Sequence, residues 1–157
     1  MPEMQPPDLP TTPTANSLPS DDTTSAAAAE GPDRVLVVDD DEDAAEALRL
    51  LLTQDGYEVR VAHDGVGALS AFASFKPHLA ILDISMPDMT GYELAEKLKE
   101  IAGSHVTGLV ALTGFGTEQD RRRALEAGFS RLLLKPLSYV TVAETVGDML
   151  RRMPRVT

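Results

Sequence analysis

The sequence predicts an α/β domain built on a doubly wound, five-stranded parallel sheet. From residue 34 onward, five short apolar runs alternate with five longer segments whose apolar residues recur at helical spacing. Parallel strands must be joined by crossovers, which helices on both faces of the sheet supply. The runs are largely apolar rather than alternating with polar residues, as expected for strands buried on both faces.

The strands are expected where Val, Leu, Ile and Ala cluster. Aromatic residues make up only 4% of the chain, so aliphatic side chains must build the core. In chain order, the expected strands are residues 34–38 (RVLVV), 57–62 (YEVRVA), 79–83 (LAILD), 106–113 (VTGLVALT) and 131–135 (RLLLK).

The helices are expected where apolar residues recur three and four positions apart. Acids suit the start of the first helix, Asp64 suits the N-cap of the second, and Thr117 begins a Thr-x-x-acid capping box in the fourth. The expected helices are residues 41–56, 64–75, 90–101, 117–128 and 138–153. Inward-facing positions are expected at Val66, Leu69 and Phe72 in the second helix and at Leu94, Leu98 and Ile101 in the third.

Residues 1–32 differ in composition from the rest of the chain. They hold seven of the 11 prolines, no aromatic residue and only acidic charges. Such a segment buries too little apolar area to offset the entropy lost on folding. We therefore expect a disordered tail rich in Pro, Ser, Thr and Ala over residues 1–32, serving as a solubilising linker or a docking segment, and a folded domain over residues 33–154.

The composition argues against several classes of protein. No run approaches the roughly 20 apolar residues of a transmembrane helix, and the N-terminus lacks the features of a secretory signal. There is no cysteine, which excludes disulfides and is compatible with a reducing cytoplasm. A net charge of −11 argues against non-specific nucleic-acid binding.

Polar residues follow several of the predicted strands, at the edge where doubly wound sheets bind their ligands. They are Asp39 and Asp40 after the first strand, Asp83 after the third, Thr113 after the fourth and Lys135 at the end of the fifth. Each alone could belong to a helix start, a turn or the surface. As a set, they predict a rim that combines three carboxylates, a hydroxyl and an ammonium group.

Three converging carboxylates need cations to balance them. Two like charges about 4 Å apart repel by roughly 4 kcal/mol at an effective dielectric constant near 20. Lys135 supplies one positive charge, and Mg²⁺, which prefers carboxylates, water and phosphate oxygens, suits the second. We expect Asp83 to be a nucleophile at this rim.

The motifs VLVVDDD, LAILDISMPDMTGYEL, ALTG and LLLKP resemble the receiver domain of two-component response regulators, of the chemotaxis-regulator type. The resemblance extends from about Arg34 to Met153 and implies a flavodoxin-like (βα)5 fold. It implies that Asp83 is the phosphoacceptor. It also implies that Asp40 binds Mg²⁺ directly, that Asp39 acts mainly through water, and that the main-chain carbonyl of Ser85 completes the protein ligands.

The resemblance also implies roles for the end of the sheet. Thr113 matches the switch hydroxyl and Lys135 the lysine of the family, while Pro136 matches a position that usually follows a cis peptide bond. Asp41 is interpreted as helix-start charge rather than a ligand. Arg121 to Arg123 are interpreted as a solvated helix face, with contact to a partner as the alternative. The three histidines are interpreted as ordinary surface or turn residues without metal-ligand spacing.

The implied function is that of a cytoplasmic signalling domain. A sensor histidine kinase or a histidine phosphotransfer protein would donate the phosphoryl group, and the face of residues 117–128, 131–135 and 138–153 would signal to a downstream protein. The domain would catalyse only its own phosphorylation and dephosphorylation, with neither nucleic acid nor membrane as a partner. No output domain follows in this sequence, which fits a stand-alone receiver, a phosphorelay intermediate or a fragment equally well.

Two positions depart from the pattern or modify it. Leu132 stands where the family often has Tyr or Phe, which puts the coupling of Thr113 to the output face in question. Phe115 is bulky and apolar two residues after Thr113, and we expect it to slow self-dephosphorylation.

The alternative function is a Mg²⁺-dependent phosphatase with an aspartyl nucleophile. Such enzymes commonly carry a second acid two residues after the nucleophile, where this chain has Ser85.

Overall fold

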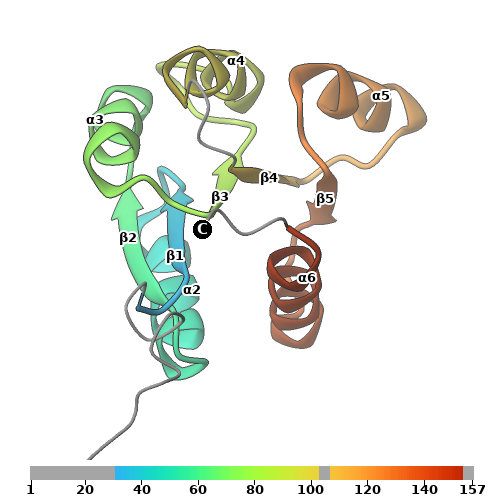
Figure 1. Cartoon of the computed structure of the whole chain (residues 1–157). Helices are drawn as coiled ribbons and strands as arrows, with labels where there is room; N and C mark the ends of the chain where they lie inside the picture. Colours follow the sequence, from blue (N-terminus) through green and yellow to red (C-terminus); the bar gives the residue numbers. More distant parts are fainter. Residues whose placement is uncertain (1–30, 103–106, 154–157) are drawn as a thin grey trace, which may run out of the picture. The chain divides into compact units, whose positions relative to one another are not determined.

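The computed structural model describes residues 31–102 and 107–153 and contains one five-stranded parallel sheet (Figure 1). The strand order is β2-β1-β3-β4-β5, and every neighbouring pair is parallel. This architecture confirms the predicted fold class. The strands are β1 (Arg34–Val38), β2 (Glu58–Ala62), β3 (Leu79–Asp83), β4 (Gly108–Thr113) and β5 (Arg131–Leu134).

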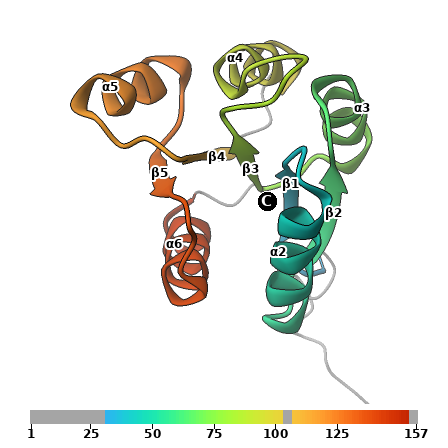
Figure 2. The same cartoon turned by 180° about the vertical axis from the view of Figure 1, so that it is seen from behind.

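Helices cover both faces of the sheet. Helices α2 and α6 lie on one face and α3, α4 and α5 on the other, as the front and back views show (Figures 1 and 2). The helices are α2 (Glu42–Gln54), α3 (Gly65–Phe75), α4 (Gly91–Ala102), α5 (Glu118–Ala127) and α6 (Tyr139–Arg152). Among the described residues, no helix combines the length and the hydropathy needed to cross a bilayer.

The sheet separates two apolar layers because successive side chains of a strand point to opposite faces. In β1, Leu36 and Val38 join the layer under α3, α4 and α5, whereas Val35 and Val37 join the layer under α2 and α6. All four side chains are fully buried, as are those of the central strand β3. The buried centre of the sheet therefore carries Asp39, which follows β1, and Asp83, which ends β3.

The predicted helix starts are largely confirmed. Asp64 is the N-cap of α3 and Thr117 begins a capping box in α5. Asp41 is the N-cap of α2, where its carboxylate accepts hydrogen bonds from the main-chain N–H groups of Asp43 and Ala44. Element ends differ from the predicted ranges by up to two residues, as expected where helices fray.

Three details of the prediction are wrong. Val66 is 71% exposed, because Ala68, Phe72 and Phe75 form the buried stripe of α3 and Val66 is two residues, or about 200°, away from Ala68. Ile101 follows the buried stripe of α4 but lies in its last turn and is 49% exposed. Strand β2 alternates between exposed and partly buried side chains up to the buried Ala62, because it pairs only with β1 at the edge of the sheet.

Parts of the predicted organisation lie outside the described residues. The predicted tail over residues 1–32 falls there except for residues 31 and 32, so its disorder stays a prediction. Residue 106 at the start of the predicted fourth strand and residue 154 at the domain end also lie outside.

Candidate functional site

Strands β1 and β3 bring the predicted carboxylates together. Val38 pairs with Leu82, so Asp39, which follows β1, lies beside Asp83, the last residue of β3. Oxygens of Asp39, Asp40 and Asp83 all lie within 4.8 Å of one another. Asp39 and Asp83 are buried, with exposed fractions of 1% and 3%, whereas Asp40 is exposed, so the cluster opens to solvent on one side.

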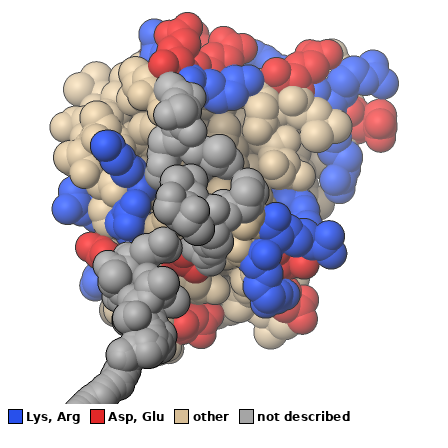
Figure 3. Space-filling view, in the orientation of Figure 1, with Lys and Arg blue, Asp and Glu red and all other residues tan. Residues whose placement is uncertain are grey.

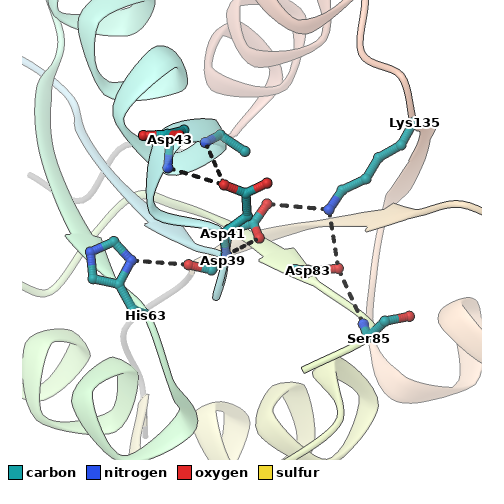
Figure 4. Close-up of polar contacts among 8 residues, drawn as sticks. Asp39, Asp41, Asp43, His63, Asp83, Ser85 and Lys135 are labelled. Atoms are coloured by element: carbon teal, nitrogen blue, oxygen red, sulfur yellow. Dashed lines mark hydrogen bonds and ion pairs between the residues drawn. The ribbon is translucent and has the colours of Figure 1, made fainter. Parts of the chain in front are cut away.

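The ammonium group of Lys135 completes the cluster, at the same carboxyl edge of the sheet but from the outer strand β5 (Figure 4). Lys135 directly follows β5, and its side chain places Nζ 3.3 Å from Oδ2 of Asp39 and 3.5 Å from Oδ1 of Asp83. One ammonium group therefore contacts two of the three carboxylates. The peptide bond between Lys135 and Pro136 is cis, as the resemblance implies.

Burial raises the pKa of Asp83 to about 6. The main-chain N–H of Ser85 lowers this pKa by donating a hydrogen bond to Oδ1, while the negative charge of Asp39 raises it and Lys135 lowers it. For Lys135, burial disfavours the ammonium form, but the carboxylates of Asp39 and Asp83 outweigh it and raise the pKa. Lys135 thus does not fully compensate for the burial of Asp83 and the negative charge of Asp39, and an additional cation would favour the ionised form of Asp83.

The donor set fits a hard divalent cation such as Mg²⁺. Three carboxylates converge, one of them at the solvent side where water can complete an octahedral shell. The carboxylates of Asp39 and Asp83 are each fixed by a main-chain hydrogen bond. Oδ1 of Asp39 accepts a hydrogen bond from Asp41 N at 3.0 Å, and Oδ1 of Asp83 accepts one from Ser85 N at 3.1 Å. The main chain therefore holds the Asp39 and Asp83 carboxylates in place without a cation.

Thr113 ends β4 beside this cluster and is 4% exposed. Its Oγ1 accepts a hydrogen bond from Phe115 N at 3.0 Å, which anchors the start of the loop between β4 and α5. Its main-chain oxygen accepts from Lys135 N at 2.8 Å, so Thr113 and Lys135 are adjacent across the ends of β4 and β5. In the part of the chain that is described, no hydrogen bond joins the Thr113 hydroxyl to the carboxylates.

Two contacts near the site were not predicted from the sequence. His63 is exposed in the turn between β2 and α3, as predicted, but its ring Nδ1 also donates a hydrogen bond to the main-chain oxygen of Asp39 at 3.0 Å (Figure 4). Asp88, in the loop after β3, accepts a hydrogen bond from Gly65 N at 2.9 Å. Both contacts join residues more than 20 positions apart, and no local motif signals them.

Comparisons with known proteins identify the family and agree with the fold. The family model described as "Response regulator receiver domain" matches residues 35–146. An uncharacterised 14.6 kDa protein of Leptolyngbya boryana is 39% identical over 112 residues, which are 71% of this chain and 86% of that protein. Response regulator MprA of Mycobacterium avium is 39% identical over 119 residues, which are 76% of this chain but only 51% of MprA.

Solved structures show the same fold. The chemotaxis protein CheY4 of Vibrio cholerae aligns with a TM-score of 0.72 and 27% identity, covering 75% of this chain and 98% of CheY4. A two-component response regulator from Clostridium difficile aligns with a TM-score of 0.73 and 27% identity, covering 78% of this chain and 99% of that one. Both alignments cover almost the whole of the solved chains.

Proposed function

The chain belongs to the response regulator receiver domain family, and from this premise we propose that Asp83 accepts a phosphoryl group in a Mg²⁺-dependent reaction. One observation carries the proposal. Three carboxylates with oxygens within 4.8 Å meet one ammonium group at the carboxyl edge of the sheet. A structural role alone would not require two buried acids side by side, since their repulsion costs stability.

The chemistry follows from the positions of the side chains. The Asp83 carboxylate forms a bond to phosphorus, the bond between phosphorus and the imidazole nitrogen of a phosphohistidine breaks, and the nitrogen keeps the electron pair. Bound Mg²⁺, held by Asp40, Asp83 and the Ser85 carbonyl with Asp39 acting through water, would neutralise charge on the phosphoryl oxygens. Lys135 lies 3.5 Å from the attacking carboxylate, where its ammonium group stabilises the same charge.

The acyl phosphate would be read through Thr113. Its oxygen accepts from Phe115 N, which leaves the hydroxyl hydrogen free to donate to a phosphoryl oxygen. Because the same hydroxyl anchors the loop that leads to α5, movement of Thr113 would shift this loop. The resulting change in population would be read on the face formed by α5, β5 and α6.

Leu132 bears on how the phosphorylation site is coupled to the output face. It is half-buried in β5 and packs against the apolar layer beneath α3, α4 and α5. The family often has Tyr or Phe at this position, and that ring can move between exposed and buried positions. Leu132 has no ring and cannot make this movement. We propose that the Thr113 loop alone couples the phosphorylation site to the output face.

The partners follow from the same chemistry. A cytoplasmic histidine kinase or phosphotransfer protein would supply the phosphoryl group, and another protein would read the output face. Nucleic acid and membrane are not expected as partners, because the net charge is −11 and basic side chains lie among acidic ones on the face shown in Figure 3. We propose that the domain signals rather than turning over an external substrate.

Incubation of the full chain with acetyl phosphate and Mg²⁺, followed by intact mass measurement, tests the proposal. One added phosphoryl group is expected in the wild type and none in Asp83→Asn, with Glu100→Gln, an exposed acid on α4, as the matched control. Steady hydrolysis of phosphate monoesters would instead support the phosphatase. Such enzymes commonly use an acid two residues after the nucleophile to protonate the leaving group, and the Ser85 hydroxyl at this position is a much weaker acid.

A further inference from the structure

The loop between β3 and α4, residues 84–90, begins beside the phosphoacceptor and returns to it. Gly91 N donates a hydrogen bond to the Ile84 main-chain oxygen at 3.0 Å. A Cβ atom on Gly91 would lie only 2.7 Å from the main-chain oxygen of Asp83, so the two ends of the loop approach more closely than any side chain allows. The loop is thus closed at its base, next to Asp83.

The far side of this loop is attached to α3. Oδ2 of Asp88 accepts a hydrogen bond from Gly65 N, at the first residue of α3, with a distance of 2.9 Å. The next residue, Met89, packs against the same glycine, since a Cβ on Gly65 would lie 2.9 Å from the Met89 sulfur. The N-cap Asp64 accepts from Gly67 N instead, so Asp88 takes a donor that the helix's own cap leaves available.

The turn before α3 also contacts the segment that follows β1. His63 donates to the main-chain oxygen of Asp39, and Gly65 donates to Asp88. Residues 63–65 therefore connect the segment after β1, which carries Asp39 and Asp40, to the loop that carries Ser85 (Figure 4 shows the His63 contact). The pairing of β1 with β3 sets the distance between Asp39 and Asp83, and this bridge adds a second connection from the segment after β1 to the loop that carries Ser85.

We infer that Asp88 is a positioning residue for the proposed metal site. Asp88 is exposed and is not one of the acids whose oxygens converge in the described parts of the chain. Its hydrogen bond to Gly65 N attaches to α3 the loop that carries Ser85, whose main-chain carbonyl is one of the proposed ligands. The inference rests on the proposed function, and it adds a residue that the motif comparison left without a role.

Calorimetric titration of Mg²⁺ into the full chain tests the inference. Asp88→Ala should weaken Mg²⁺ binding about 10-fold, the effect typical of residues that orient metal ligands. Asp88→Asn keeps an acceptor oxygen for Gly65 N and should stay within about 2-fold of the wild type. Asp120→Ala is the matched control, because it removes an acid from the capping box of α5 and should leave the affinity unchanged.

Amide hydrogen exchange of the metal-free protein gives an independent readout. The Gly65 amide should exchange faster in Asp88→Ala and at the wild-type rate in Asp88→Asn. If Asp88→Ala does not fold, Asp88→Glu, which keeps the charge but moves the acceptor by one methylene group, should weaken Mg²⁺ binding in its place.

Wild-type Mg²⁺ affinity in Asp88→Ala, or in Asp88→Glu where alanine is not tolerated, would overturn the inference. An affinity as weak in Asp88→Asn as in Asp88→Ala would also overturn it, because charge rather than the hydrogen bond would then be responsible. A wild-type chain that binds Mg²⁺ but is not phosphorylated would count against the proposed function and leave the role of Asp88 intact.

Discussion

Replacing Asp83 with asparagine should stabilise the metal-free protein at neutral pH. Asp83 is 3% exposed and lies beside Asp39, and burial raises its pKa from 3.8 to about 6. Ionising this carboxyl group at neutral pH therefore costs folding free energy. Asparagine has nearly the same shape, carries no charge and can still accept the hydrogen bond from Ser85 N.

The magnitude follows from the pKa. A change from 3.8 to about 6 corresponds to about 3 kcal/mol of differential stability. Because the site opens to water at Asp40 and Lys135, screening reduces this value to about 1–2 kcal/mol. We therefore expect the free energy of unfolding of Asp83→Asn to exceed that of the wild type by about 1–2 kcal/mol at neutral pH.

The pH dependence has a definite sign. The folded chain binds the Asp83 proton more tightly than the unfolded chain does, so this group makes the wild type less stable as pH rises from about 4 to about 6. The advantage of Asp83→Asn should therefore vanish near pH 4 and reach its full size above about pH 6. Saturating Mg²⁺ should reverse the order, because the ion stabilises the folded wild type more strongly.

Urea denaturation in the presence of a chelator, at neutral and acidic pH, measures this difference. Glu100→Gln on the exposed face of α4 is the control and should stay within about 0.5 kcal/mol of the wild type. A less stable Asp83→Asn at neutral pH, or an advantage that does not change with pH, would refute the reasoning about buried charge.

Other substitutions test separate parts of the structure. Lys135→Ala removes the ammonium group that contacts Asp39 and Asp83, and phosphorylation by acetyl phosphate should slow about 100-fold in a stopped-time mass assay; an unchanged rate would exclude a role for Lys135. Phe115→Ala trims a side chain that is 70% exposed in the loop after Thr113, and the half-life of the acyl phosphate should shorten if Phe115 limits water access; an equal or longer half-life would contradict that role. Asp41→Ala removes the N-cap of α2 and should lower the free energy of unfolding by about 1 kcal/mol, with Glu42→Gln nearly neutral in the same urea titration.

The fold could be predicted because its signals are local. An apolar run such as residues 79–83 and a capping box such as that of Thr117 each depend on a few neighbouring residues. The convergence of Asp39 and Asp83 also followed, since parallel strands end at the same edge of the sheet. Val66 shows the limit, because apolar character does not determine which helix face meets the sheet when small residues such as Ala68 supply the buried stripe.

The supporting contacts could not be predicted for a different reason. His63 reaches Asp39, and Asp88 reaches Gly65, only because β2 lies beside β1 at the edge of the sheet and α3 lies next to α4. These neighbours are set by the order of strands in space, which differs from their order along the chain. Histidine and aspartate in turns have many ordinary roles, so their residue type alone gave no indication.

Chemical mapping of the phosphorylated residue tests the central claim most directly. Borohydride reduces an aspartyl phosphate to homoserine, so peptide mass analysis after treatment with acetyl phosphate identifies the modified position. We predict homoserine at position 83 in samples that contain Mg²⁺ and unmodified aspartate in samples that contain a chelator. Modification at another residue, or equal modification of Asp83 without divalent cations, would contradict the claim.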